Sequence, residues 1–426
     1  MHPLTRLHRT AIVGRLAARL YLLYKLPEWG RRLRGLPKPT DAELAPQHAR
    51  AAELILATAL RMRGVIIKLC QAIATRADVF PPEFVERLKE CHDAVPPKPF
   101  AVVREAVERE LGKPIGAVFS EFSETPIASA SLAQVHAARL LDGTEVAVKV
   151  QYPDIEDIVR TDLRNMERAC RIYEWVDPQP LELLPLLREL TTHVGFELDM
   201  EREARSADRV REMFAKDRGV IVPKIHHELS TKRVLVMERV RGIKITEKAL
   251  IEAAGLDPAD VMQDLMRVYV QMVLAAGFFQ ADPHPGNLMV TPDKKLILLD
   301  FGLSKELPEG YGLGLFELMF SMMTLNESAM VRAFQELGFE TKTGDTSTFL
   351  LIARRMLSRS ESGAFEGEFT EEMTDELFEA IRVDPVVRVP SDFVLVGRVF
   401  SFLSGIAHTL GSRANVLAAM GAGPPG

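Results

Sequence analysis

The segment 280–302 carries polar residues whose types and spacing fit the transfer of a phosphoryl group. It begins Gln-Ala-Asp-Pro-His-Pro-Gly-Asn-Leu, and an apolar run over 296–299 leads into Asp-Phe-Gly. Phosphoryl transfer needs one carboxylate that faces the acceptor and further oxygen ligands that hold magnesium against the phosphates. The spacing assigns the first role to Asp282 and the magnesium to Asn287 and Asp300. The alternative is a hairpin whose turn contains Asp and Asn without any role in chemistry.

A lysine and a group of acids upstream complete such a site. Lys149 ends the run Val-Ala-Val-Lys on a predicted strand, where an ammonium group reaches the α- and β-phosphates of a nucleotide. This lysine needs a glutamate partner on a helix, and 196–204 supplies Glu197, Asp199 and Glu203. At about 100° per residue, Glu197 and Glu203 face different directions, so the two acids can have two roles. A strand that ends in lysine and a solvated acidic helix face are the ordinary explanations of each feature alone.

Short β-prone runs followed by long helical stretches must position these groups. Three runs read as antiparallel strands: 117–122, 132–141 and 145–150. Asp142-Gly143 forms the turn between the last two of them. The later elements are a helical stretch over 155–214, a strand over 233–239, and helices after 248 with strands near 288–290 and 296–299. The expected fold class is therefore α+β, with a small antiparallel sheet lobe before a large helical lobe.

The N-terminal segment differs from the rest of the chain in charge. Residues 1–39 hold nine Lys or Arg against one acid, a net charge of +8, whereas the whole chain carries −6. Apolar residues recur there at helical spacing beside two arginines: Ile12, Leu16, Leu20 and Leu23, with Arg15 and Arg19. Such a basic amphipathic helix is suited to an anionic membrane surface. The alternatives are a helix packed on its own domain with a solvated basic edge, and a cleaved organelle presequence.

Composition excludes several classes of protein. With 426 residues, 47% of them hydrophobic and 26% charged, the chain is long and apolar enough to form a buried core. Its net charge of −6 gives no electrostatic reason to expect nucleic acid as a partner. The three cysteines lack a CxxC spacing, which argues against a disulfide framework or a zinc cluster and favours a reducing compartment. Charged residues interrupt the apolar stretches 261–279 and 313–325, so no membrane-spanning helix is expected.

Taken together, the motifs resemble those of one family. Over a sheet and then helices, five polar residues stand in the order of the protein-kinase-like two-lobe fold: Lys149, Glu203, Asp282, Asn287 and Asp300. Alanines and serines over 126–136 stand where a protein kinase has the glycines of its phosphate loop. The helical block 41–89 adds Lys-Leu-Cys-Gln, Thr-Arg-Ala-Asp and Phe-Pro-Pro-Glu-Phe. This combination resembles the UbiB/AarF family of atypical kinase-like proteins, associated with ubiquinone and other isoprenoid-lipid metabolism, over roughly 41–410.

Within this resemblance, each family motif falls on residues of this chain. The Lys-x-Gly-Gln signature corresponds to Lys68 and Gln71, and the Glu-x-Asp motif to Glu197 and Asp199. The implied nucleotide-binding residues are Ala128, Ser129, Ala130, Ser131, Lys149, Glu238, Lys68, Gln71 and Glu197. The implied catalytic residues are Asp282, Lys149 and Glu203, and the implied metal ligands are Asn287 and Asp300. The implied cofactors are ATP or ADP and Mg²⁺.

The resemblance also implies that the signature helix covers the active site. Lys68 would pair with Glu197 and form a lid over the place where a kinase binds a peptide. The chain departs from the family pattern at Cys70, where the signature has glycine, at Ser129, where the loop has its central alanine, and at Ser206, where asparagine is expected. The transmembrane hairpin that some members carry near the C-terminus is not expected here.

Two absences argue against phosphorylation of proteins. Ala281 precedes Asp282 where a protein kinase has arginine, so no cation at this position pairs with an activation-loop phosphate. No Ala-Pro-Glu follows Gly302, so the platform that holds a peptide is missing. The expected acceptor is a lipid, a quinone precursor or another small molecule, and plain hydrolysis of ATP is also consistent with the motifs.

These features lead to the hypothesis of a magnesium-dependent atypical kinase or ATPase that supports isoprenoid-lipid or quinone metabolism. The alternatives are a pseudokinase-like switch, whose nucleotide state controls binding to a lipid or a partner, and a kinase of antibiotics or choline. The expected location is the cytoplasm, with peripheral contact to a membrane surface. The expected domains are a basic arm 1–39, a helical extension 40–110, a sheet lobe with a helical insert 111–240 and a helical lobe 241–426.

Overall fold

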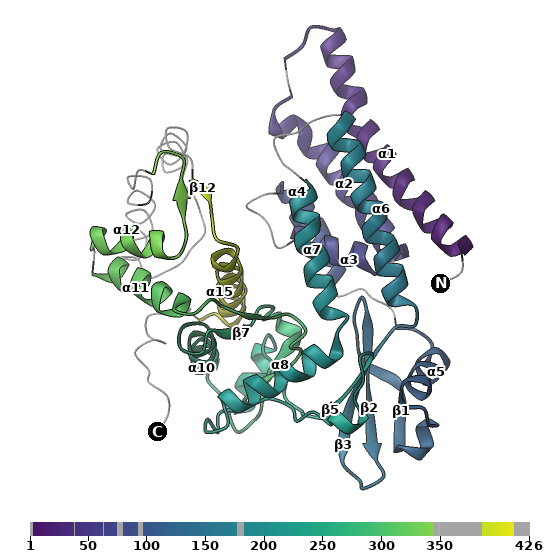
Figure 1. Cartoon of the computed structure of the whole chain (residues 1–426), viewed down its shortest axis with the longest axis vertical. Coiled ribbons are helices and arrows are strands. Elements are labelled where there is room, and N and C mark those ends of the chain that lie inside the picture. Colours follow the sequence, from purple (N-terminus) through teal and green to yellow (C-terminus); the bar gives the residue numbers. More distant parts are fainter. Residues whose placement is uncertain are drawn as a thin grey trace. The chain divides into compact units, whose positions relative to one another are not determined.

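The chain folds into two compact units (Figure 1). The computed structural model describes residues 3–37, 39–62, 64–74, 80–92, 97–176, 183–324, 326–344, 349 and 386–412. Unit 1 comprises Met1–Ala204 and Ile225–Arg239, and unit 2 comprises Arg205–Lys224 and Val240–Gly426. The chain passes from unit 1 to unit 2 within helix α8 (Met200–Met213).

A four-stranded antiparallel sheet belongs to unit 1 and agrees with the predicted strands, except that the first strand was expected over 117–122 and instead continues to Ser129. Its order is β1 (Phe119–Ser129), β2 (Ala133–Leu140), β3 (Glu145–Gln151) and β5 (Val234–Glu238). Gly143, at a φ of +89°, lies in the turn between β2 and β3, because glycine enters the left-handed region without strain. Val146, Val148 and Val150 alternate onto one face of the sheet, where they share a buried core with α5 (Phe100–Leu111).

Helices on both sides of the sheet in sequence form a second core in unit 1. They are α1 (Pro3–Leu33), α2 (Asp41–Met62), α3 (Val65–Ala74), α4 (Pro82–Leu88), α6 (Ile155–Val176) and α7 (Leu183–Glu197). Ile155, Val159 and Met166 recur at helical spacing on the buried face of α6. They pack with apolar residues of α3, which carries the Lys68 to Gln71 signature. Residues 75–79, which include part of the resemblance motifs, lie outside the described residues.

Helix α1 packs on its own unit over its first half. Val13 is buried in the helical core, and Arg9 donates both to the carboxylate of Asp162 on α6 and, at 3.0 Å, to the carbonyl of Met62. Asp162 is fully buried, and this burial raises the pKa of its carboxyl although Arg9 opposes the shift. Of the alternatives for the basic segment, a helix packed on its own domain describes this half.

Unit 2 is mainly helical, with short strands that hold the loops of the predicted site. A small sheet has the order β4 (Val220–Ile221), β9 (Leu296–Leu298), β8 (Leu288–Val290) and β6 (Ile243–Lys244). Two further antiparallel pairs are β7 (Phe278–Gln280) with β10 (Ser304–Glu306) and β11 (Glu340–Thr341) with β12 (Val386–Arg388). The helices include α9 (Lys248–Ala253), α10 (Pro258–Val270), α11 (Tyr311–Met323), α12 (Glu327–Glu336) and α15 (Ser391–Leu410).

The start of α10 follows ordinary capping chemistry. The carboxylate of Asp257 accepts a hydrogen bond from the backbone N–H of Ala259 at 2.8 Å, and Pro258 takes the first helical position. Val261, Leu265 and Val268 then bury one face of the helix. This rigid helix precedes the predicted catalytic segment in the chain.

Helix α15 is, within the described part of the chain, the one helix long and apolar enough to cross a membrane by length and composition. Its apolar stretch is 33% buried. One face of the helix is buried and includes Val399, Leu403 and Ile406. In its first turn, Asp392 forms an ion pair with Lys305 at 2.7 Å. The stretch 391–410 is not among the candidate membrane spans considered from the sequence, which were 261–279 and 313–325. The buried face and the ion pair favour a helix that packs within unit 2.

Candidate active site

Lys149 and Glu203 form a buried ion pair in unit 1. Lys149 lies on β3, between Val135 of β2 and Leu235 of β5. Its Nζ lies 2.7 Å from Oε1 and 2.9 Å from Oε2 of Glu203, so both carboxylate oxygens accept from the ammonium. The side chains are only 14% and 3% exposed. Charge-assisted contacts of this kind hold both groups in one orientation.

Glu203 owes its place to the way α8 begins. The carboxylate of Asp199 accepts a hydrogen bond from the backbone N–H of Arg202 at 2.9 Å, which caps the helix. Glu203 then lies in the first turn, where a carboxylate also complements the helix dipole. The structure therefore places Asp199, the acid of the Glu-x-Asp motif, as the cap of the helix that carries Glu203.

A second ion pair joins the signature helix to the end of α7. Lys68 Nζ lies 2.7 Å from Oε2 of Glu197, and the side chains are 19% and 23% exposed. Gln71, one turn further along α3, donates its side-chain amide to the carbonyl of Cys91 at 3.1 Å. The predicted partners Lys68 and Glu197 are thus brought together, while the amide of Gln71 is used inside the helical block.

Cys70, which replaces the signature glycine, lies in the core of the helical block. The residue is fully buried and packs with Cys91 in the same apolar cluster. A hydrogen bond with the Cys91 thiol and burial raise the pKa of the Cys70 thiol. The thiol stays protonated and behaves as a small apolar side chain.

The segment Ala128 to Ser131 is predicted to lie over a nucleotide. Its first two residues end β1, and Ala130 and Ser131 begin the tight connection to β2. The backbone N–H of Ala130 donates to the carbonyl of Ala133 at 2.8 Å. Tyr152 fixes this connection, since its hydroxyl lies 3.0 Å from the Ser129 hydroxyl and donates to the carbonyl of Ala130 at 3.1 Å. Ser131 is 2% exposed. Glu238 is the exposed last residue of β5, next to the end of unit 1.

Asp282, Asn287 and Asp300 come together in unit 2 through the β8–β9 hairpin. The side-chain amide of Asn287 donates to the backbone carbonyl of Asp282 at 3.4 Å. The backbone carbonyl of Asn287 accepts from the backbone N–H of Leu299 at 2.8 Å. This register places Asn287 beside the residue that precedes Asp300. Carboxylate and amide oxygens are suitable ligands for magnesium, so the residues present fit that ion.

Asp300 adopts a left-handed conformation that is rare for a residue with a side chain. Its φ is +59°, and its Oδ1 accepts a hydrogen bond from the backbone N–H of Gly302 at 3.2 Å. Such a conformation costs free energy of about 1–3 kcal/mol, and surrounding contacts must maintain it. Left-handed Asp is tolerated because its short side chain bonds to nearby backbone, as it does here.

A buried network behind Asp300 supplies those contacts. Gln280 is fully buried and donates its side-chain amide to the carbonyls of Leu299 and Asp300. The hydroxyl of Tyr269, on α10, donates to the side-chain carbonyl of Gln280. Burial, and then the negative charge of Asp282, raise the pKa of Tyr269 well above its ordinary value, so the phenol keeps its proton. This network connects α10 to the loop that carries the predicted metal ligand.

The sequence of this chain also matches a known protein family. A family model described as the ABC1 atypical kinase-like domain matches residues 90–334, more than half of the chain. The chain belongs to this family. The resemblance to UbiB/AarF proteins is therefore confirmed, because relatives of the chain carry AarF and ABC1-kinase names.

Several relatives extend over most of this ABC1-family chain. It is 32% identical to the uncharacterized protein sll1770 of Synechocystis over 94% of the chain and 68% of that protein. It is 30% identical to AarF domain-containing protein kinase 1 of Xenopus laevis over 86% of the chain and 72% of that protein. It is 32% identical to ACTIVITY OF BC1 COMPLEX KINASE 7, chloroplastic, of Arabidopsis thaliana over 87% of the chain but 54% of that protein, about half of its length.

A solved structure supports the fold of this ABC1-family chain. The complex of Rv3197 with erythromycin from Mycobacterium tuberculosis matches with a TM-score of 0.60 at 24% identity. The match covers 89% of this chain and 96% of that one. Together with the family match, it confirms the expected α+β kinase-like two-lobe fold.

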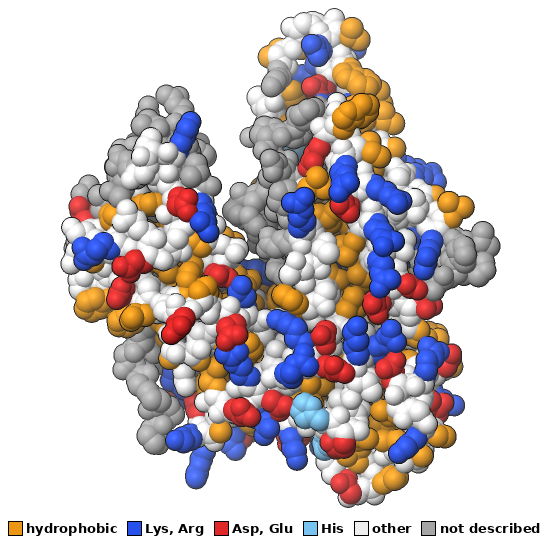
Figure 2. Space-filling model, in the orientation of Figure 1, with side chains coloured by type: hydrophobic (Ala, Val, Ile, Leu, Met, Phe, Trp, Pro, Cys, Tyr) orange, Lys and Arg blue, Asp and Glu red, His pale blue; other side chains and the backbone are white. Residues whose placement is uncertain are grey.

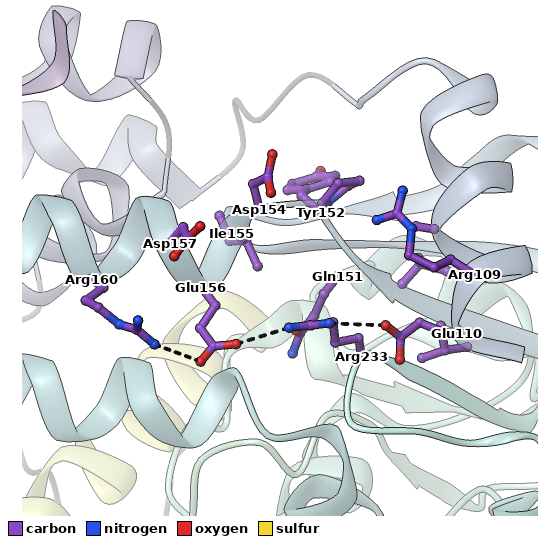
Figure 3. A pocket seen from close by; sticks show the side chains of 14 residues that line it. Arg109, Glu110, Gln151, Tyr152, Asp154, Ile155, Glu156, Asp157, Arg160 and Arg233 are labelled. Carbon is purple, nitrogen blue, oxygen red and sulfur yellow. Dashed lines mark hydrogen bonds and ion pairs between the residues drawn. The ribbon is translucent and has the colours of Figure 1, made fainter. Parts of the chain in front are cut away.

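A polar cavity in unit 1 lies apart from the residues that the ABC1 motifs single out. It has a volume of about 210 Å³ and is found where β3 runs into α6 (Figure 3). Arg233 crosses its lining and contacts Glu110 and Glu156, both at 3.3 Å. Arg160 pairs with the same Glu156 at 3.2 Å. These ion pairs on the cavity wall connect α5 and α6 through Arg233, the residue directly before β5.

Sequence reasoning assigned no role to Tyr269 or Gln280, and it missed Arg398 on α15. Arg398 Nη2 lies 3.6 Å from Oδ1 of Asp282. Gln280 stands in the motif segment, so its position was visible although its hydrogen bonds were not. Arg398 carries no signal at all, because it lies far along the chain from Asp282 and only folding brings the two together.

Proposed function

We propose that this ABC1-family chain is a magnesium-dependent atypical kinase or ATPase that binds ATP or ADP. The observation that carries the proposal is the buried ion pair between Lys149 of β3 and Glu203 of α8, in which both carboxylate oxygens contact the ammonium group. A lysine held in this way is the phosphate-binding group of kinase-like folds. The family match supports an atypical kinase-like domain.

In this proposal each residue has a separate task. Lys149 contacts the α- and β-phosphates, and Glu203 orients it. Asn287 and Asp300 are the residues that would hold magnesium, which neutralises the phosphates and orients them when bound. Asp282 accepts the proton of the acceptor hydroxyl or of water. The network of Tyr269 and Gln280 keeps Asp300 in its left-handed conformation.

We infer a lipid or quinone-precursor acceptor in isoprenoid metabolism rather than a protein. Ala281 is fully buried and offers no cation for an activation-loop phosphate. The segment after Gly302 forms β10 and then α11, without Ala-Pro-Glu. Lys68 paired with Glu197 supports the lid proposed for the signature helix. No nucleic acid is proposed as a partner, in keeping with the net charge of −6.

The second half of α1 supports a peripheral contact with an anionic membrane. Its large apolar side chains are exposed: Leu22 44%, Leu26 56%, Trp29 47% and Leu33 89%. The end of α6 adds Trp175 at 85%, and Tyr21 of α1 stacks edge-on with Tyr173 of α6 at 6.4 Å. Figure 2 shows hydrophobic side chains gathered at the upper end of the helical block, with Lys and Arg side chains below them. Apolar anchors beside basic residues suit an anionic lipid surface.

The decisive test is ATP hydrolysis by the purified chain with and without magnesium. The assay is repeated with anionic liposomes and with quinone-like phenols. Magnesium-dependent turnover, increased by these additions, is the expected result. A chain that binds nucleotide but is inert under all conditions would instead support the nucleotide-controlled switch.

A further inference from the structure

A cation from the C-terminal part of unit 2 lies beside the predicted catalytic aspartate. Arg398 Nη2 is 3.6 Å from Asp282 Oδ1, and the side chains are 25% and 31% exposed. At this separation the charges attract across a partly buried region, where solvent screens them less than at the surface. The motifs around Asp282 do not predict an arginine at this position.

The surroundings hold Arg398 in place. Val399 and Leu403 belong to the buried face of α15, and Asp392 ties the start of the helix to Lys305 at 2.7 Å. The guanidinium carbon of Arg398 lies 5.6 Å from the ring centroid of Phe402, one turn along the helix. A guanidinium group on a fixed helix, with an aromatic ring beside it, has few alternative positions.

Phe402 also connects this arginine to the catalytic segment. Its ring meets the ring of His284 edge-on, with 6.5 Å between centroids. His284 in turn accepts a hydrogen bond from the backbone N–H of Gly286 at 3.2 Å through Nδ1. Helix α15 therefore contacts the segment that begins at Asp282 at two points, through an ion pair with Asp282 and a ring contact with His284.

The ion pair with Asp282 engages Nη2 of Arg398 and leaves its Nε donor unengaged. Its Nε is buried and has no hydrogen-bond partner among the described residues. An unpaired buried donor costs free energy, so an arginine with a purely structural role would be expected to have a hydrogen-bond partner for its Nε. The position and the unused donor fit a group that serves the aspartate and the reacting anion rather than helix packing.

We propose that Arg398 is the positioning residue of Asp282, in an inference that rests on the proposed function. It holds the carboxylate toward the acceptor and provides from α15 a cation that the buried Ala281 does not provide. In the reaction, the acceptor oxygen forms a bond to the γ-phosphorus while the bond to the β,γ-bridging oxygen breaks. The electron pair of that bond leaves on ADP, and the acceptor proton passes to Asp282 and then to solvent.

The test compares R398M, which keeps an apolar stem beside Phe402, with R398K, which keeps the charge. R388M is the matched control, because Arg388 forms a 2.7 Å ion pair with Glu340 in the same unit but is exposed. We expect R398M to lower kcat by about 10- to 100-fold with KM for Mg-ATP within about twofold of the wild type. R398K should recover part of kcat, and R388M should behave as the wild type.

Two further measurements separate positioning from structure. In a D282N background, R398M should cause no additional loss of kcat, because the residue acts through the missing carboxylate. Without nucleotide, the melting temperatures of R398M, D282N and the double variant should show coupling between the two sites. A purely structural arginine would lower the melting temperature of R398M and leave kcat of the folded protein unchanged.

The outcomes are distinguishable. Active wild type with R398M at wild-type kcat, or equal losses in R398M and R388M, would overturn the role of Arg398 and leave the proposed function standing. A further loss of kcat on adding R398M to D282N would also overturn it. A wild-type chain that binds Mg-ATP but never turns it over would overturn the proposed function, and the role of Arg398 with it.

Discussion

Lys149 and Glu203 form a charge pair that stability alone does not require. Removing two charges from water costs free energy, and apolar residues of similar volume often stabilise a core at least as well. The pair nevertheless lies 86% or more out of solvent, with both carboxylate oxygens engaged. Loss of Glu203 alone would remove the carboxylate that pairs with this buried ammonium group, at a cost of about 3–5 kcal/mol in the free energy of unfolding. The proposed role of the lysine in binding phosphate gives a reason for this charge pair.

Three substitutions separate nucleotide binding from turnover. K149M removes the proposed phosphate-binding cation and D300N weakens the proposed metal ligand, so each should abolish or greatly reduce binding of Mg-ATP. D282N should keep binding within a few-fold and lower kcat by about 100- to 10,000-fold, because the proposal assigns its carboxylate to the acceptor. Thermal shift with Mg-ATP measures binding, and phosphate release measures turnover.

The control for these substitutions is K216M, which changes an exposed lysine outside the proposed site. It should leave both measurements unchanged. Equal loss of binding in K149M, D300N and D282N would contradict the separate roles. Retained turnover in D282N would show that another group accepts the proton.

At the scale of elements, the signature helix α3 is tied to α7 rather than left on the surface. Lys68 and Glu197 meet at 2.7 Å with about four-fifths of each side chain buried. The same helix contributes Cys70 to the helical core and Gln71 to the carbonyl of Cys91. Since one element supplies an ion pair, a core contact and a hydrogen bond, a change at one of these positions shifts the helix as a whole.

A double-mutant cycle on Lys68 and Glu197 tests this connection. K68A and E197A should each lower the free energy of unfolding, and the double variant should be less than additive by about 0.5–3 kcal/mol. The matched control is the exposed pair Arg171 and Glu167 on α6, at 2.7 Å, whose coupling should stay near 0.3–0.5 kcal/mol, roughly the value of surface pairs.

The lid proposed for α3 predicts a second effect in the same variants. K68A should alter the preference between ATP and ADP or expose self-phosphorylation, measured by nucleotide affinity and by transfer of labelled phosphate. Additive effects on stability, together with unchanged affinity and no self-labelling, would show that α3 does not cover the site.

The two halves of helix α1 differ in how their side chains are buried. Its first half is fastened by Arg9 to the buried Asp162, so truncation of this helix would leave that carboxylate unpaired and destabilise unit 1. Its second half exposes Trp29 and Leu33. A test of membrane contact therefore needs substitutions in the second half rather than removal of the segment.

W29S with L33S should weaken binding to anionic liposomes and leave the melting temperature within about 2 °C of the wild type, because both side chains are exposed. Binding of the wild type should fall as salt rises, since arginines contribute. Sedimentation with vesicles that contain phosphatidylglycerol, and with neutral vesicles as control, measures both. Cosedimentation of the double variant at the wild-type level would exclude this end of α1 as the contact.

At the scale of the whole molecule, the predicted functional residues are divided between two units. Unit 1 carries Lys149, Glu203 and the signature helix, and unit 2 carries the predicted catalytic segment. Each group is built by a different means. In unit 1 a sheet register and a capped helix bring the lysine and glutamate together, whereas in unit 2 a β-hairpin and a buried Tyr–Gln network hold the acidic residues.

The sequence alone determined the features that depend on neighbours along the chain. Alternating valines predicted β3, the Asp-Gly turn predicted its hairpin, and the spacing of Asp282 and Asn287 predicted one loop. These inferences hold because strand pairing through a short turn and contacts within a few residues follow from local geometry. The family resemblance extended them to Lys68 and its partner.

Only the tertiary structure decided the contacts between distant segments. Arg398 beside Asp282, Arg9 on Asp162 and Gln280 behind Asp300 involve ordinary residue types, and nothing in their spacing distinguishes them from solvated side chains. A polar residue receives a partner when packing of apolar faces brings two elements together, and that packing depends on the whole core rather than on a local pattern. The sequence thus predicted the candidate reacting groups, and only the folded chain shows which distant residues contact them.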